Sequence, residues 1–247
     1  EKSVRIIKSL ISQKHIAKAQ DSEAESRIDY LADILGLSKR EVISVVERMR
    51  QEGILADSKD ISAYLQDAGD SERKSQILLE RFAKLEQYIL NHIPDGALRI
   101  SYKQLNENAV NDGINTSKEK DIRTLLYFLT IKGYTRKKED AIHNIEISRQ
   151  TDLDSTIRRF EKRLEISRFT VEWLYQLASD AEKENVPGKA IQFSVVELLN
   201  QIKSSSQSLF GGLDDIQLED VEEALLYLSK IGSLKLEGGF LVLYNAM

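Results

Sequence analysis

The clearest hydrophobic pattern lies in residues 28–51 and predicts two helices joined by a tight turn. Gly36 permits the left-handed backbone that ends the first helix. Ser38 and Glu41 have the spacing of a capping box at the start of the second. The apolar positions of this second helix recur at i, i+3, i+4 and i+7, at Val42, Val45, Val46 and Met49. We therefore predict a helix-turn-helix, followed by a small β wing that returns through residues 61–65.

The same order of helices, glycine turn and short strands is predicted twice more. In the second copy, helices are predicted at residues 77–93, 102–110 and from 116 or 117 to 131, with a strand at 141–147 after the segment TRKKED. In the third copy, helices are predicted at residues 155–185, 193–203 and 218–231, followed by a hairpin around Glu237-Gly238-Gly239. The polar stretch 66–75 is predicted to be a linker.

This repetition predicts a mainly α fold with small β wings, arranged as a tandem array of three winged-helix domains. The modules are predicted at residues 1–70, 71–150 and 151–247. Because the chain opens on Glu1 without an initiator Met, we expect it to be part of a longer protein.

The distribution of charge differs between the three modules, although the net charge of the whole chain is −5. Residues 1–70 hold 11 basic and 13 acidic side chains, residues 71–150 hold 14 and 11, and residues 151–247 hold 10 and 16. Only the middle module is basic, and phosphate backbones are bound by Lys and Arg. It is therefore the first candidate for contact with nucleic acid.

The candidate DNA-binding residues are basic side chains on the third helix and wing of the middle module and on the third helix of the first. They are Lys118, Lys120, Arg123, Lys132, Arg136, Lys137 and Lys138, with Lys39 and Arg40 as weaker candidates. A solvated basic surface without a ligand is the open alternative.

The third module has the opposite character. Its helix at residues 218–231 carries four acidic side chains near its start, which would repel phosphates, so we do not expect it to enter a DNA groove. The basic stretch from Arg158 to Arg168 alternates with Glu161 and Glu165 and is predicted to be a salt-bridged helix surface. Phe169 and Trp173 are predicted to belong to the core.

Three segments resemble the region after the motor core of large bacterial RecQ-like helicases: SVVERMRQEGILADSKDISAYL, RLEISRFTVEWLY, and FSVVELLNQI with the hairpin end LEDVEEALLYLSKIGSLKLEGGFLVLYN. The resemblance implies accessory winged-helix domains of an ATP-driven DNA-unwinding enzyme whose motor lies outside this sequence. It departs from the family in lacking the four-Cys zinc subdomain, because the chain has no Cys, and in carrying glycines at the hairpin tip with Phe240 behind them.

Catalytic and cofactor chemistry finds no support in the sequence. The chain contains no phosphate-binding loop, dinucleotide fingerprint or nucleophile elbow. The zero cysteine count removes thiolate zinc sites and disulfides and suits a reducing cytoplasm. His15, His92 and His143 lack metal-site spacing, and no apolar run reaches the roughly 18 residues of a membrane span. We expect no cofactor, no metal and no membrane contact.

Two functions remain open. In the first, the modules contact duplex or forked DNA beside the helicase motor of the same parent chain. In the second, the array is a protein-interaction scaffold without direct DNA contact, which the net negative charge favours.

Overall fold

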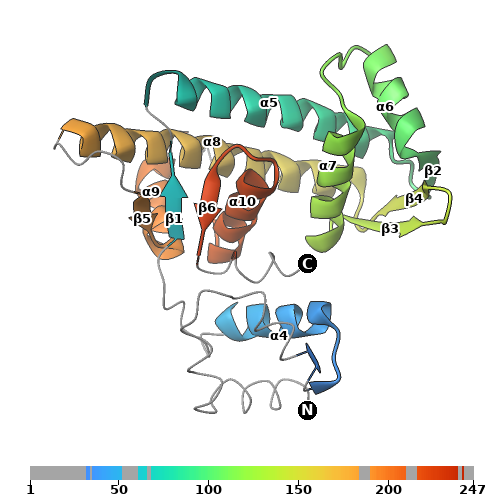
Figure 1. Cartoon of the computed structure of the whole chain (residues 1–247), viewed down its shortest axis with the longest axis horizontal. Helices are drawn as coiled ribbons and strands as arrows, with labels where there is room; N and C mark the ends of the chain where they lie inside the picture. The colour runs from blue at the N-terminus through green and yellow to red at the C-terminus, as the bar shows by residue number, and fades with distance from the viewer. Residues whose placement is uncertain are drawn as a thin grey trace. The chain divides into compact units, whose positions relative to one another are not determined.

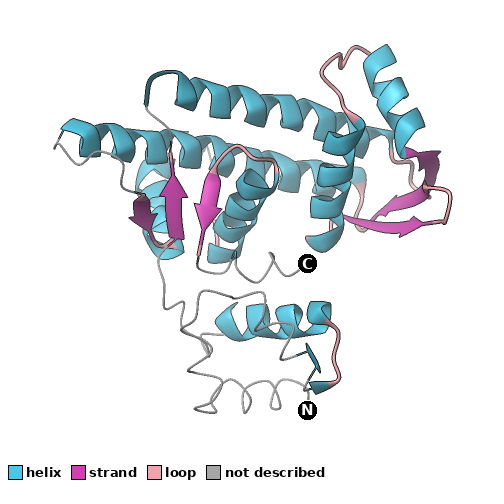
Figure 2. Cartoon of the chain, in the orientation of Figure 1, coloured by secondary structure: helices cyan, strands magenta, loops and turns pink. Residues whose placement is uncertain are grey.

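The computed structural model describes residues 32–33, 35–51, 61–65, 68–183, 190–209, 216–238 and 241 (Figure 1). Contacts divide the chain into two compact units. The first comprises Glu1–Ser62, Gln192–Ser194 and Leu236–Met247, and the second comprises Ala63–Ile191 and Val195–Lys235. The described part is mainly helical with small three-stranded sheets, which confirms the predicted mixed, mostly helical class (Figure 2).

The helices follow the predicted order, whereas the short strands at residues 98–101 and 191–193 were not predicted. The helices are α4 (Lys39–Gln51), α5 (Ala68–His92), α6 (Tyr102–Asn111), α7 (Glu119–Ile131), α8 (Leu153–Lys183), α9 (Val195–Leu209) and α10 (Leu218–Lys230). The strands are β1 (Ile61–Tyr64), β2 (Leu98–Ser101), β3 (Thr135–Glu139), β4 (Asn144–Arg149), β5 (Ile191–Phe193) and β6 (Lys235–Glu237).

The predicted linker at residues 66–75 is wrong over most of its length, because α5 already begins at Ala68. Polar residues near the start of a helix can lie in solvent, where they lower the stability of the helix only slightly. Composition alone therefore does not separate such a helix from a linker. Ser75 shows what the composition missed, since this residue is buried and hydrogen-bonded to Ser233.

In the first unit, the predicted start of α4 is confirmed. The backbone N–H of Ser38 donates to the Glu41 carboxylate at 3.0 Å, and the N–H of Glu41 donates to the Ser38 hydroxyl at 3.3 Å. These reciprocal bonds satisfy two amide groups that a helix start leaves without partners. Val42 and Ile43 are buried on α4. The wing predicted after this helix falls largely on residues 52–60, outside the described residues.

The second unit is built on two long helices, α5 and α8, which run side by side (Figure 1). Helix α7 packs against α5, and α10 packs against α8, α9 and α7. Residues of both the predicted middle and third modules therefore belong to this unit. The division into three modules stays a prediction.

Strands β2, β4 and β3 form an antiparallel sheet in that order (Figure 2). Ile145 and Ile147 of β4 are buried on its inner face. The register places Glu146 of β4 between Arg99 of β2 and Lys138 of β3 on the outer face. The other described sheet has the strand order β5-β1-β6. The second arm of the hairpin predicted after β6 lies outside the described residues, apart from Leu241.

A buried ion pair joins α5 to α8. The Arg163 guanidinium of α8 donates to the Glu86 carboxylate of α5, and the two side chains are 1% and 0% exposed. Burial raises the pKa of Glu86 above its usual value against the attraction of Arg163. Burial also disfavours the charge on Arg163, but the attraction of Glu86, together with smaller contributions from Tyr134, Tyr227 and Glu223, outweighs this and raises the pKa of the guanidinium. Each charge is therefore tolerated only because the other is present.

Aromatic rings from several elements enclose this pair. The guanidinium carbon of Arg163 lies 4.2 Å from the ring centroid of Tyr227 on α10, 4.7 Å from that of Phe128 on α7 and 5.0 Å from that of Tyr134. Cations over aromatic faces gain up to about 2 kcal/mol when they are desolvated. Arg163 therefore holds α5, α7, α8 and α10 together at one point.

Removing one partner of this pair should be far more harmful than removing both. We predict that Glu86→Gln lowers the free energy of unfolding by about 3–5 kcal/mol, because the charge of Arg163 is left buried without its counterion. The double change Glu86→Leu with Arg163→Met should recover most of that loss. Urea unfolding of the full chain measures both values.

Glu80 provides the matched control, since it joins the same two helices through Arg168 at 2.7 Å in an ion pair whose side chains are 44% and 41% exposed. Glu80→Gln should cost no more than about 1 kcal/mol. Equal losses for Glu86→Gln and Glu80→Gln would contradict the importance of the buried pair.

Candidate nucleic-acid interface

Two of the predicted binding residues, Arg123 and Lys137, are held by a cluster around Tyr102. Tyr102 is the first residue of α6, behind the cap of Ser101, and it is buried. The Arg123 guanidinium carbon lies 3.9 Å from the Tyr102 ring centroid. The Tyr102 hydroxyl accepts from Lys137 Nζ at 2.9 Å and donates to Glu139 Oε2 at 3.3 Å. These two bases therefore serve the fold and are less available to a ligand than their sequence positions predict.

Glu139 at the end of β3 completes this cluster. It lies 3.7 Å from Lys137 Nζ and 4.0 Å from Arg123 Nη1. A hydrogen bond from His143 and the positive charge of Lys137 hold the pKa of Glu139 below its usual range. The carboxylate thus stays ionised and fixes the end of β3 against α7.

Arg136 and Lys138 point to the opposite side of β3 and are exposed. Arg99 on β2 joins them, because its register partner on β4, Glu146, is also the partner of Lys138. We call Arg99, Arg136 and Lys138 the outer basic face. Arg99 was not among the binding residues predicted from the sequence. Its signal was the alternation of apolar and basic residues in Leu98–Ile100, directly before α6.

Lys118 and Lys120 lie at the amino end of α7 and are exposed. Lys118 is the N-cap residue, and its side chain makes no capping hydrogen bond. Within the described part of the chain, the side chains of Lys118, Lys120, Arg136 and Lys138 make no ion pair or hydrogen bond. These four residues of the predicted middle module are therefore free to meet an anion.

The other predicted residues lie elsewhere. Lys132 is half-buried at the end of α7, where its carbonyl accepts from Arg159 Nη2 of α8 at 2.7 Å. Lys39 and Arg40 are exposed at the start of α4, in the first compact unit.

Two acidic side chains of α10 are paired with basic side chains of α8. Arg159 pairs with Glu223, and Lys162 Nζ lies 2.8 Å from Asp220 Oδ2. Glu223 also accepts from the Tyr134 hydroxyl at 2.7 Å. The prediction that the basic stretch of α8 is salt-bridged is confirmed for these residues, but their partners lie on α10 rather than on α8 itself.

Arg168 differs from them, because it pairs both with Glu165 of its own helix at 2.6 Å and with Glu80 of α5. Phe169 and Trp173, predicted to be core residues, are half-buried on α8.

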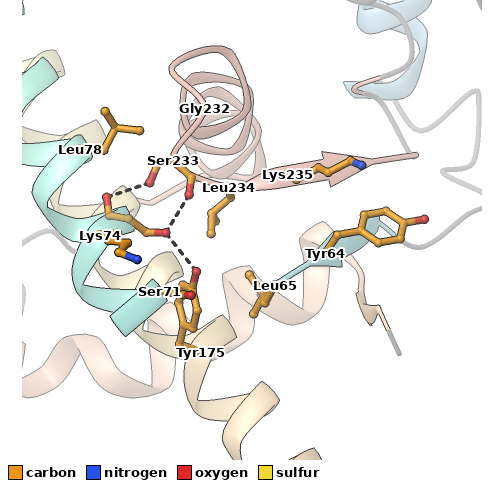
Figure 3. Close-up of a pocket in the computed structure, with 11 residues that line it drawn as sticks. Tyr64, Leu65, Ser71, Lys74, Leu78, Tyr175, Gly232, Ser233, Leu234 and Lys235 are labelled. Atoms are coloured by element: carbon orange, nitrogen blue, oxygen red, sulfur yellow. Dashed lines mark hydrogen bonds between the residues drawn. The ribbon is translucent and has the colours of Figure 1, made fainter. Parts of the chain in front are cut away.

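A hollow of about 250 Å³ lies between the start of α5, α8 and the turn after α10 (Figure 3). Ser75 Oγ donates to the Ser233 carbonyl at 2.9 Å, and Ser233 Oγ donates to the Ser75 carbonyl at 3.1 Å. Because the hydroxyl proton of Ser75 is thus used, the Tyr175 hydroxyl, 3.1 Å away, must donate to Ser75 Oγ. These bonds join α5, α8 and the turn after α10. These polar groups are hydrogen-bonded to one another across the hollow.

No arrangement for metal binding occurs among the described residues. His92 stacks on Tyr88 with ring centroids 3.9 Å apart, and His143 contacts Glu139, while His15 lies outside the described residues. Burial and a hydrogen bond to Asp112 raise the pKa of Tyr88 to about 12.

Even α5 and α8, the longest helices described, lack an apolar stretch able to cross a bilayer.

The Tyr102 cluster can be tested by removing a single hydroxyl. We predict that Tyr102→Phe costs about 1–2 kcal/mol of unfolding free energy, since Lys137 and Glu139 both lose a hydrogen bond, and that Tyr102→Ala costs about 3–5 kcal/mol. Tyr88→Phe, which loses an exposed bond to Asp112, should cost less than about 1 kcal/mol. If Tyr102→Phe were as mild as Tyr88→Phe in urea unfolding, the cluster would not hold α6, α7 and β3 together.

Comparison with known proteins gives no match for this chain. No protein-family model matches the chain, and no curated protein sequence or solved structure is significantly similar to it.

Proposed function

We propose that the chain is a non-catalytic array of winged-helix modules that contacts duplex or forked DNA. The order α5, β2, α6, α7, β3, β4 with sheet order β2-β4-β3 is the arrangement expected of a winged helix. In this interpretation α7 is the recognition helix and the β3–β4 hairpin is the wing. The order helix, strand, helix, helix, strand recurs from α8 to β6, which supports a second module of the same kind.

The observation that carries the proposal is the free basic charge on both parts that such a module would present to DNA. Lys118 and Lys120 lie at the amino end of α7, and Arg136 and Lys138 lie on the outer side of the hairpin. Phosphate neutralisation by such side chains supplies most of the affinity of non-specific binding. The proposed ligand is therefore the sugar–phosphate backbone rather than a base sequence.

The acidic module has a different proposed role. Asp220 and Glu223 of α10 are engaged by α8, so α10 supports the packing of the basic module instead of binding DNA. Together with the resemblance to RecQ-like helicases, this favours an accessory region beside an ATP-driven motor domain of the same parent protein.

The proposal predicts salt-sensitive binding of the full chain to duplex and forked DNA. Arg136→Glu with Lys138→Glu should weaken binding at low salt by at least about tenfold. It should also make the slope of log K against log salt shallower by about 2, near 0.9 for each lost phosphate contact. Fluorescence anisotropy over a salt series measures both quantities.

Arg73→Glu with Arg158→Glu is the matched control, because it makes the same charge change at exposed positions of α5 and α8. Binding should then weaken far less than with the hairpin variant. Absence of binding by the unmodified chain at low salt, or equal losses in both variants, would contradict the proposal.

A second candidate function, a protein-interaction scaffold, has one observation in its favour. The carboxyl half of α7 is covered by α10, since Lys230 Nζ lies 5.7 Å from the Tyr127 ring centroid and Phe128 packs edge-on against Tyr227. Only the amino half of α7 is then left to enter a DNA groove. Salt-resistant binding to a RecQ-like motor domain in a pull-down, without DNA binding, would favour the scaffold.

A further inference from the structure

The outer side of the sheet β2-β4-β3 carries one carboxylate among its described strand residues. Because strand residues alternate between faces, the outer set consists of Arg99 and Ser101 on β2, Asn144, Glu146 and Ser148 on β4, and Arg136 and Lys138 on β3. Among these strand residues Glu146 is the one acid beside three bases, and it lies on the central strand. Asp140, in the turn after β3, lines the same hollow as Arg99, Lys138 and Glu146.

Glu146 contacts Arg99 directly and lies beside Lys138 in the sheet. Arg99 Nε donates to Glu146 Oε2 at 2.8 Å, and Lys138 is the residue paired with Glu146 on the other side. The side chain of Arg99 is 80% exposed and that of Glu146 is 36% exposed. Stability does not require this pair, because exposed ion pairs contribute little to folding.

For a phosphate that approaches this face, the same carboxylate has a large effect. It offsets one of the three positive charges, and it engages the Arg99 guanidinium that would otherwise be free to contact the phosphate. Like charges also repel, since an approaching phosphate oxygen comes near the carboxylate. Both effects lower the affinity of the face.

We propose that Glu146 is a built-in electrostatic restraint, which keeps the contact of the outer basic face with a phosphate backbone weak. The proposal rests on the proposed DNA contact and adds its regulation. A weak, sequence-independent contact is one that a protein can break and re-form as it moves along DNA. Removal of the carboxylate converts this sliding contact into a tighter one.

The test is Glu146→Gln in the full chain. Glutamine keeps a side-chain oxygen that can accept from Arg99 Nε, so the midpoint of thermal unfolding should not change. Binding to a duplex oligonucleotide at low salt should tighten by about three- to tenfold. The log–log salt slope should steepen by about 0.9, because the positive charge of Arg99 is no longer offset by a carboxylate and can neutralise one further phosphate.

Glu107→Gln is the control with the same change in net charge. Glu107 is exposed on α6 and lies 4.0 Å from Lys103, away from the three strands. Tightening confined to Glu146→Gln supports the restraint. Equal tightening in both variants would show that only net charge matters, and would overturn it.

The proposed function can fail separately. If the unmodified chain binds DNA and Arg136→Glu with Lys138→Glu weakens that binding, but Glu146→Gln leaves it unchanged or weaker, the restraint is wrong and the DNA contact stands. If neither the unmodified chain nor Glu146→Gln binds DNA at low salt, both proposals fall.

Discussion

The buried pair of Glu86 and Arg163 is the constraint on which the second compact unit depends. Two charges without solvent are tolerated only at short range, so α5 and α8 are fixed relative to each other at this point. The surrounding rings of Phe128 and Tyr227 add α7 and α10 to the same contact. An apolar core tolerates small shifts of one helix along another, whereas a buried charge pair among aromatic rings permits very few. Through Phe128 the pair anchors α7, whose amino end carries Lys118 and Lys120.

A second consequence is the sorting of charge between inside and outside. The net charge is −5, yet much of the acidic charge of α10 is turned inward: Glu223 is buried against Arg159 and Tyr134, and Asp220 is paired with Lys162. Each acid engaged in this way no longer repels an approaching polyanion at full strength, since the field of a close ion pair falls off much faster than that of a single charge. An acidic chain can therefore carry an outward basic face, and its net charge is a poor guide to its partners.

Much of the fold could be predicted from sequence, because helix periodicity and caps are local signals. The Ser38–Glu41 capping box and the bounds of α10 agree with the pattern to within a few residues. What could not be predicted is which distant side chains meet. Arg163 belonged to a stretch interpreted as helix surface. No local rule indicates that it would be buried and paired with Glu86, which lies 77 positions earlier in the sequence. For the same reason the sequence did not separate Arg123 and Lys137, which Tyr102 holds, from Arg136 and Lys138, which are free.

The alternation along β3 explains why neighbouring bases have opposite roles. Lys137 points inward to Tyr102 and Glu139, where it fixes the hairpin against α6 and α7, while Arg136 and Lys138 point outward. A rigid hairpin presents its outward charges without the loss of backbone entropy that a mobile loop would incur on binding. The three bases of the outer basic face, with Glu146 among them, still give only a modest electrostatic attraction to a phosphate backbone. A face of this strength would act best beside another DNA-binding domain, where linkage makes the second contact intramolecular and multiplies two weak affinities.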